Sequence, residues 1–276
     1  MKSKILDIYK KEGVLGITRK VFLFPFRFVW YKLGLRNWWL QDHWLLGKLT
    51  EIIYGDEVKI NDIKIFINDP VISVPIKCRF ILNRYETEER DVVQKFLDTE
   101  IPVVEFGGSI GVISCITNRI LKFPEKHIVI EANSNLIPIL RKNQNLNNCR
   151  FEIINKAVSY DKENVVFYIH DKFIGGSVCR KTTRSISVPV ITLKKIIDDN
   201  NFKKINLICD IEGTEIEMIS KDLQAIKDHV LVAVIGFHPG ISKISEIEQA
   251  KEIMLRSNFD CVYDKKFTCV FLNKTL

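Results

Sequence analysis

The chain of 276 residues lacks several features that mark common protein classes. Its seven cysteines include no CxxC pair and no histidines cluster with them, which argues against a zinc or other metal site and predicts reduced core thiols. The apolar run over residues 21–31 is interrupted by Pro25 and Arg27 and is far shorter than a spanning helix, so we expect none. Since no signal peptide is visible, we expect a cytoplasmic protein.

Positive charge is concentrated at the start of the chain. Residues 1–50 contain ten Lys or Arg and three acidic residues, an excess equal to the net charge of +7, so residues 51–276 are neutral overall. All four tryptophans lie in this basic segment, which we expect to be helical. Two interpretations stay open: the segment lies at the inner face of an anionic membrane, or its aromatic side chains pack onto the rest of the chain or a second subunit.

A glycine turn between two apolar strands is the most informative pattern. One strand runs into Gly107, Gly108 and Gly111, an apolar helix opens at Ser109, and the next strand ends in Glu131. Glycines at such a turn let a ligand lie against the backbone, and Glu131 follows Gly111 by 20 residues, where a carboxylate meets ribose hydroxyls. The pattern predicts a cradle for a nucleoside-containing cofactor.

Strands and helices alternate along most of the chain. Residues 51–82 are strand-like around a hairpin turn at Asn61 and Asp62, and a helix begins at Thr87. Further strands are predicted at 151–158, 164–170, 185–193, 205–209, 230–237, 260–263 and 267–272, with a helix at 136–146. The last two strands are too close together for a crossover helix, so they should pair antiparallel.

Several motifs resemble the FkbM family of S-adenosylmethionine-dependent methyltransferases over about residues 80–273. They are Tyr85-Glu86, Glu105 to Gly111, Glu131-Ala132-Asn133, the spaced Asn143 and Asn147, Lys156 to Ser159, Val190 to Leu193, and Asp210-Ile211-Glu212-Gly213-Thr214-Glu215, the most specific of them. The chain departs from the family at Glu105 for the usual Asp, at Ala132 for the usual proline, and at Gly236, where many members have an acid.

The resemblance implies an α/β fold with the doubly wound, seven-stranded Rossmann-like sheet of class I methyltransferases. We expect a basic aromatic helical segment over residues 1–50, a hairpin and lead-in helix over 51–100, and the S-adenosylmethionine-binding domain over 101–276. Glu105 also favours this cofactor, because methyltransferases usually carry an acid at that position and dehydrogenases usually do not.

The resemblance further implies where S-adenosylmethionine binds. Glu105 would meet its ammonium group directly or through water, and Glu131 would bind its ribose. The other expected cofactor residues are Gly107, Gly108 and Gly111 at the amino-acid end, Asn133 in the motif of Glu131, and Ala157 and Val158 near the adenine.

Three predicted catalytic residues follow strands at the carboxyl edge of the sheet: Asp210, Glu212 and His238. A sugar hydroxyl needs a group that takes its proton, and Asp210 is the first choice for this base. Glu212 and Glu215 have the alternative role of stabilising a helix start, and His238 that of a structural histidine. The missing acid at Gly236 matters for any mechanism that needs a carboxylate beside His238.

The sequence favours O-methylation of a sugar hydroxyl in a surface polysaccharide or lipid-linked glycan. Methylation of RNA is a second hypothesis, which the neutral charge of residues 51–276 disfavours. A membrane-recruited binding module with a non-catalytic methyltransferase fold is a third. The basic loop with Arg180, Lys181 and Arg184 either meets an acidic group of the acceptor or is simply solvated.

Overall fold

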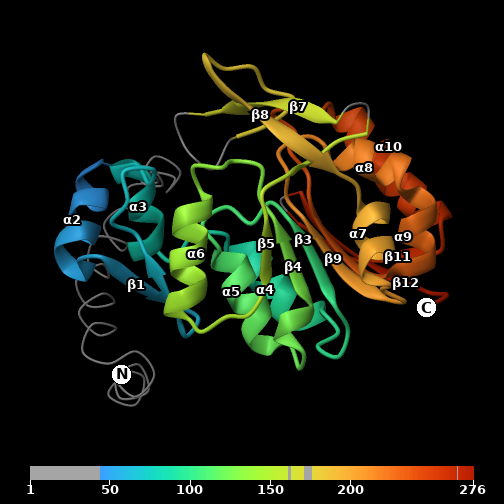
Figure 1. Cartoon of the computed structure of the whole chain (residues 1–276), viewed down its shortest axis with the longest axis horizontal. Helices are drawn as coiled ribbons and strands as arrows, with labels where there is room; N and C mark the ends of the chain where they lie inside the picture. The colour runs from blue at the N-terminus through green and yellow to red at the C-terminus, as the bar shows by residue number, and fades with distance from the viewer. Residues whose placement is uncertain (1–43, 161–162, 171–175, 266) are drawn as a thin grey trace, which may run out of the picture. The chain divides into compact units, whose positions relative to one another are not determined.

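The structure is a computed structural model that describes residues 44–160, 163–170, 176–265 and 267–276 (Figure 1). These residues belong to two compact units, one with residues 44–55 and 74–85 and the other with 56–73 and the chain from 86 onward. The predicted domain boundaries after residues 50 and 100 stay predictions. The expectations for residues 1–43 lie outside the described residues.

The smaller unit is a pair of helices, α2 (Trp44–Tyr54) and α3 (Val74–Ile81). Gly47 allows their close approach, since a Cβ there would lie 1.8 Å from the carbonyl oxygen of Val74. An ion pair of 2.7 Å joins Glu51 to Lys77, whose side chain is buried. The prediction of strand-like structure over all of residues 51–82 is therefore wrong at both ends, which are helical. There the buried side chains recur with the period of a helix rather than that of a strand.

The larger unit is built on a seven-stranded sheet with the order β11-β12-β10-β9-β3-β4-β5. Its strands are β3 (Val103–Phe106), β4 (His127–Ile130), β5 (Glu152–Ile154), β9 (Ile205–Cys209), β10 (Val230–Gly236), β11 (Phe259–Lys265) and β12 (Thr268–Asn273). Strand β12 runs antiparallel to both of its neighbours, while the pairs from β10 to β5 are parallel. This order, with one reversed strand, confirms the predicted class I methyltransferase fold.

Helices cover both faces of this sheet (Figure 1). One set is α4 (Thr87–Phe96), α5 (Val112–Ile120) and α6 (Ile137–Leu146); the other is α7 (Leu193–Asn200), α8 (Glu215–Lys221), α9 (Leu223–His229) and α10 (Ile244–Arg256), and a 3₁₀ turn spans Pro124–Lys126. Alternate residues of the central strands, such as Val104 and Phe106, pack against the second set in the main core. Of the helices in the described ranges, none is long and apolar enough to cross a bilayer.

A separate small sheet has the order β6-β8-β7, with β6 (Ala157–Val158), β7 (Asn164–Ile169) and β8 (Arg184–Ile191). The predicted antiparallel pairing of β7 with β8 is confirmed. A single strand over residues 151–158 is wrong, because β5 ends at Ile154 and β6 joins the other sheet by pairing with β8. The sequence does not reveal this change of partner, since both pieces are apolar.

The predicted hairpin consists of β1 (Glu57–Ile60) and β2 (Ile63–Phe66), with Asn61 and Asp62 at positive φ in its turn. The outer edge of β2 is bound by two asparagines of the α6 region. Asn143 Oδ1 accepts from Phe66 N at 2.7 Å while its Nδ2 donates to Ile110 O at 2.7 Å. Asn147 bonds both the N–H and the carbonyl of Lys64. These two asparagines therefore tie the hairpin and the glycine turn to α6.

We expect Asn143→Ala to lower the free energy of unfolding by about 2–4 kcal/mol, because it leaves Phe66 N and Ile110 O without their buried partner. Urea unfolding measures the change. Asn145→Ala is the control, since Asn145 is an exposed neighbour on the same helix. Equal stability of the two variants would contradict the structural role of Asn143.

Candidate active site

The glycine turn leads from β3 to α5 and packs against Asp210, which follows β9. The backbone N–H groups of Gly107 and Gly108 both donate to Ile130 O, at 2.9 and 3.1 Å. Gly107 has φ of 93°, and a Cβ there would lie 1.9 Å from the carbonyl oxygen of Asp210. Glycine is thus required at this position both by the backbone angle and by the contact with Asp210.

The other two predicted glycines pack against side chains. A Cβ on Gly108 would lie 2.4 Å from Val129 Cγ1, and one on Gly111 would lie 2.7 Å from Leu140 Cδ1. Helix α5 begins at Val112, three residues later than the predicted start at Ser109, because Ser109 and Gly111 both have positive φ. The three glycines form a tight cradle, and their contact with a cofactor stays a prediction.

Glu131, which follows β4, binds the backbone of the glycine turn through its carboxylate. Its Oε2 accepts from Ser109 N at 2.6 Å and its Oε1 from Asn133 N at 2.7 Å, while Asn155 Nδ2 donates to Glu131 O at 2.7 Å. Burial raises the pKa of Glu131 to about 7, although hydrogen bonds from the backbone of Asn133 and Ser109 favour the carboxylate. The carboxylate therefore joins the glycine turn to the turn at Asn133, whose Oδ1 accepts from Asn135 N.

Ser109 provides a test of whether a ligand fits here. Its Oγ is buried and has no hydrogen-bond partner among the described residues. A buried hydroxyl of this kind needs a partner, and a polar ligand in the cradle would supply one. The glycines, the unpartnered hydroxyl and Glu131 together fit a cofactor that carries polar groups.

Glu105 is buried on the strand that leads into the glycine turn and contacts other side chains of the protein. It is 1% exposed, Ser114 Oγ donates to its Oε1 at 2.6 Å, and His127 Nε2 lies 3.0 Å from its Oε2. Because side chains alternate along β3, Glu105 points away from the face of Val104 and Phe106, and its length brings it to α5 and β4. Both carboxylate oxygens have partners inside the protein, and the predicted contact of Glu105 with a cofactor ammonium, directly or through water, stays a prediction.

Ala157 and Val158 are also buried, at the pairing of β6 with β8. Val158 belongs to the main core, and Ala157 belongs to a small cluster with Phe167 and Val188. Their predicted position near an adenine stays a prediction.

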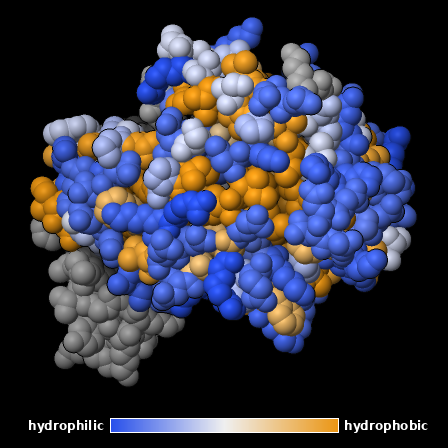
Figure 2. All heavy atoms as spheres, in the orientation of Figure 1, coloured by the Kyte–Doolittle hydropathy of each residue, from blue (hydrophilic) through white to orange (hydrophobic). Residues whose placement is uncertain are grey.

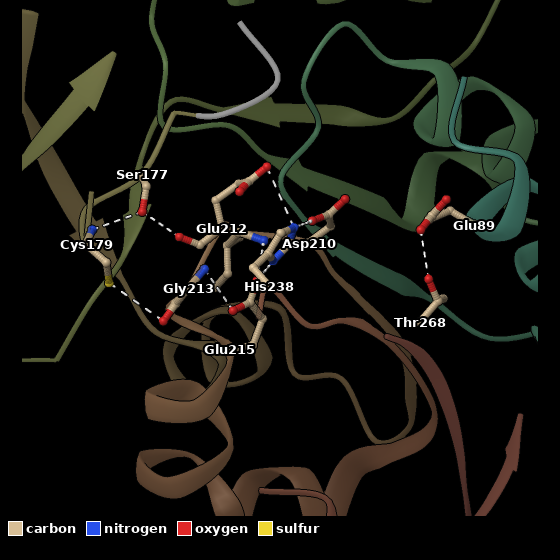
Figure 3. Close-up of polar contacts among 10 residues, drawn as sticks. Glu89, Ser177, Cys179, Asp210, Glu212, Gly213, Glu215, His238 and Thr268 are labelled. Carbon is tan, nitrogen blue, oxygen red and sulfur yellow. Dashed lines mark hydrogen bonds and ion pairs between the residues drawn. The ribbon is translucent and has the colours of Figure 1, made fainter. Parts of the chain in front are cut away.

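The three predicted catalytic residues come together at the carboxyl ends of β9 and β10 (Figure 3). His238 Nε2 lies 3.1 Å from Asp210 Oδ1 and 3.7 Å from Glu212 Oε1, and His238 Nδ1 lies 2.9 Å from Glu215 Oε1. Asp210 itself is held by its N–H, which donates to Phe106 O at 3.0 Å. The carboxylate that a mechanism needs beside His238 is thus present despite Gly236.

His238 is an imidazolium in this arrangement. Burial alone would lower the pKa of His238, but its hydrogen bonds with Asp210 and Glu215, and the charges of these two residues, outweigh burial and raise the pKa to about 11. Since both ring nitrogens then carry protons, His238 has no lone pair with which to accept another. In this form His238 would orient the neighbouring carboxylates, and its predicted catalytic role stays a prediction.

Glu215 fixes the turn that carries the other acids. It is 1% exposed; its Oε1 accepts from Ile211 N at 3.1 Å and its Oε2 from Gly213 N at 2.9 Å. Glu212 and Gly213 have φ of 53° and 110°, so this turn needs such support. The sequence indicated only a helix-start role for Glu215, and its bond to His238 depends on a contact between distant strands.

The pKa values of two further carboxyl groups are raised beside Asp210. Burial raises the pKa of Glu212 to about 7, against the charge of His238. Burial, followed by the charge of Asp210, raises the pKa of Glu89, which accepts from Thr268 Oγ1 at 2.8 Å. The sequence placed Glu89 in the first turn of a helix, and nothing local indicated that α4 brings it to this site.

The connection between β7 and β8 contacts the same turn (Figure 3). Ser177 Oγ donates to Glu212 O at 2.5 Å and accepts from Cys179 N at 3.0 Å. Ser177 also pairs through its backbone with Tyr168. Arg180 is exposed, and its charge favours the ionised form of Glu212. Ser177, in the connection between β7 and β8, therefore supports the candidate catalytic turn.

Asp210, Glu215 and His238 also present donor atoms within 4.8 Å of one another. Such a set can in principle hold a metal ion. Both nitrogens of His238 already face carboxylates, however, so an imidazolium accounts for the geometry. The expectation of a metal-independent site stays a prediction.

No family model matches the chain, and no curated protein matches it. The resemblance to the FkbM family therefore stays a prediction.

Several solved structures are similar to this chain. A protein of the NADB-Rossmann superfamily from Streptococcus agalactiae shares 9% identity over 68% of this chain and 69% of its own, with a TM-score of 0.42. The O-methyltransferase from Bacillus cereus in complex with SAH shares 11% identity over 68% of this chain and 82% of its own, with a TM-score of 0.44. Precorrin-6y C5,15-methyltransferase from Geobacter metallireducens shares 11% identity over 68% of this chain and 89% of its own, with a TM-score of 0.41.

Because these TM-scores are low, the fold is assigned from the order and direction of the strands in the large sheet. With β12 reversed between β10 and β11, that order gives the chain the Rossmann-like class I methyltransferase fold.

Proposed function

We propose that this chain is an S-adenosylmethionine-dependent O-methyltransferase that methylates a sugar hydroxyl of a surface polysaccharide or lipid-linked glycan. The observation that carries the proposal is the set of acidic residues around the glycine turn: Glu131 bonds to the turn, and Asp210, whose backbone carbonyl lies against Gly107, interacts electrostatically with Glu212 and Glu89. Such surroundings favour a cofactor with a sulfonium and an ammonium group and repel the pyrophosphate of a dinucleotide.

The cradle is suited to hold the cofactor close to the acids. The glycines would let its amino-acid end approach the backbone, Ser109 Oγ would gain a partner, and Glu131 would accept from ribose hydroxyls. When bound, S-adenosylmethionine supplies an already activated methyl group. The protein then has to position the acceptor oxygen in line with that group and exclude water.

Asp210 is the proposed base. Its carbonyl oxygen is in contact with Gly107, so it lies next to the cofactor cradle, and its Oδ1 is oriented by His238. An acceptor hydroxyl would lose its proton to the Asp210 carboxylate as the new bond to oxygen forms. His238 holds the carboxylate in place, and Glu215 holds His238.

The pH dependence of the reaction should reflect Glu212. Because the pKa of Glu212 is about 7, we expect kcat/KM to increase from about pH 6 to about pH 8 as Glu212 becomes negative and strengthens Asp210 as a proton acceptor. His238, with a pKa of about 11, stays charged over this range. Glu131, whose pKa is also about 7, acts on cofactor binding, so the assays use saturating S-adenosylmethionine. Under these conditions Glu212→Gln should flatten the profile, and the same inflection in that variant would refute the role of Glu212.

The acceptor class rests on the resemblance to the FkbM family and is tested by activity. The full chain would be incubated with S-adenosylmethionine labelled in its methyl group and with glycan, lipid-linked glycan or RNA fractions. Label in a glycan fraction supports the proposal, whereas label in RNA supports the second hypothesis. Cofactor binding without transfer to any fraction would favour the non-catalytic module.

A further inference from the structure

Helix α2 presents an apolar face to solvent. The exposed fractions are 58% for Trp44, 55% for Leu45, 38% for Leu49, 78% for Ile52 and 46% for Ile53. At 3.6 residues per turn these five positions fall within about half of the helix circumference. Figure 2 shows hydrophobic side chains at the left of the view, where Figure 1 places α2. Apolar side chains gathered in this way usually mark an interaction surface.

The opposite face of α2 is fixed against α3. Gly47 and Thr50 are buried, Thr50 Oγ1 donates to Leu46 O, and Glu51 pairs with Lys77. Because Gly47 stands so close to Val74 that a side chain would not fit, the helix cannot turn its apolar face inward. The exposure of Ile52 and its neighbours therefore follows from the packing of this helix pair.

The charge of the same part of the chain identifies the partner. Residues 1–50 carry the excess of seven positive charges, whereas residues 51–276 are neutral. On α2 itself, Lys48 lies between Trp44 and Ile52 along the apolar face, with its Nζ 5.8 Å from the centre of the Trp44 ring. The same Nζ lies 2.7 Å from Glu51 Oε2, so most of the positive charge comes from the rest of residues 1–50. Apolar and tryptophan side chains beside cations suit the headgroup region of an anionic bilayer.

A second copy of the chain is a poorer partner for this face. A symmetric dimer through α2 would bring two equally basic segments together and would be opposed by their repulsion. An anionic bilayer accommodates both the apolar side chains and the charge.

We infer that the face formed by Trp44, Leu45, Leu49, Ile52 and Ile53 docks on the surface of an anionic membrane. The inference deepens the proposed function, on which it rests, because it gives the enzyme a place beside a lipid-linked acceptor. It assigns the membrane contact to one helix face, whereas the sequence indicated the basic segment as a whole.

Co-sedimentation of the full chain with lipid vesicles tests this inference. The vesicles would contain phosphatidylcholine alone or with about one third phosphatidylglycerol. We expect binding to the anionic vesicles, weaker binding at high salt, and at least tenfold weaker binding for Leu45→Glu/Ile52→Glu. Leu255→Glu is the matched control, because Leu255 is an exposed leucine at 47% on α10.

Ile52→Lys separates an apolar contact from charge alone. This variant adds a positive charge, so we expect weaker binding if Ile52 inserts and stronger binding if only charge matters. Wild-type binding by the glutamate variant, stronger binding by Ile52→Lys, or no binding by the wild type would overturn the inference. So would a dimer in size-exclusion chromatography that only the α2 variants lose. Since no cofactor or acceptor is present, failure here is distinguishable from failure of methyl transfer.

Discussion

Asp210→Asn should lower kcat by about 10²–10⁴-fold while leaving the affinity for S-adenosylmethionine within a few-fold of the wild type. The asparagine keeps the shape of the side chain and an oxygen for His238 Nε2, which lies 3.1 Å from Oδ1 in the wild type. It removes only the negative charge and the ability to take a proton. Single-turnover kinetics measures the rate, and calorimetry measures the affinity.

Asp198→Asn is the matched control for this variant. Asp198 is exposed on α7, where it pairs with Lys194, and its substitution should leave kcat unchanged. Wild-type turnover by Asp210→Asn would refute the assignment of Asp210 as the base. Loss of cofactor affinity with retained turnover at saturation would instead make Asp210 a binding residue.

Gly107→Ala should have the largest effect on the cofactor site. Its methyl group would lie 1.9 Å from the carbonyl oxygen of Asp210, and φ of 93° is strained for any L residue. Backbone strain and overpacking together should lower the free energy of unfolding by about 2–6 kcal/mol. The forced movement should also displace the glycine turn from Asp210, so we expect loss of cofactor binding.

Gly240→Ala is the control for that substitution, because a Cβ on Gly240 would have no atom within 4 Å. Thermal unfolding compares the two variants with the wild type. A Gly107→Ala protein with wild-type stability and affinity would show that the contact between the glycine turn and β9 is unimportant.

Most of the fold follows from local sequence patterns. The apolar residues of β3, β4 and β9 are buried on both faces and read as short apolar runs between turns, as parallel strands do. The hairpin followed from its Asn61-Asp62 turn, and the reversed strand followed from the short link before it. The misplaced elements, α3 and the break between β5 and β6, depend on packing partners that local patterns do not specify.

The candidate site was predicted less completely, because side-chain direction and long-range contacts decide it. The grouping of Asp210, Glu212 and His238 followed from their common position after strands. The direction of Glu105 toward Ser114 and His127 depends on strand alternation and on which helix covers that face. The approach of Glu89 from α4 and the buried support from Glu215 required the folded chain.

Calorimetric titration of the full chain with S-adenosylmethionine, with NAD⁺ as the competing ligand, tests whether the site at the glycine turn binds a sulfonium cofactor. We predict that S-adenosylmethionine binds, that NAD⁺ does not, and that Gly107→Ala abolishes the binding while Gly240→Ala retains it. Binding of NAD⁺ in preference to S-adenosylmethionine, or no binding of either by the folded wild-type chain, would contradict this prediction.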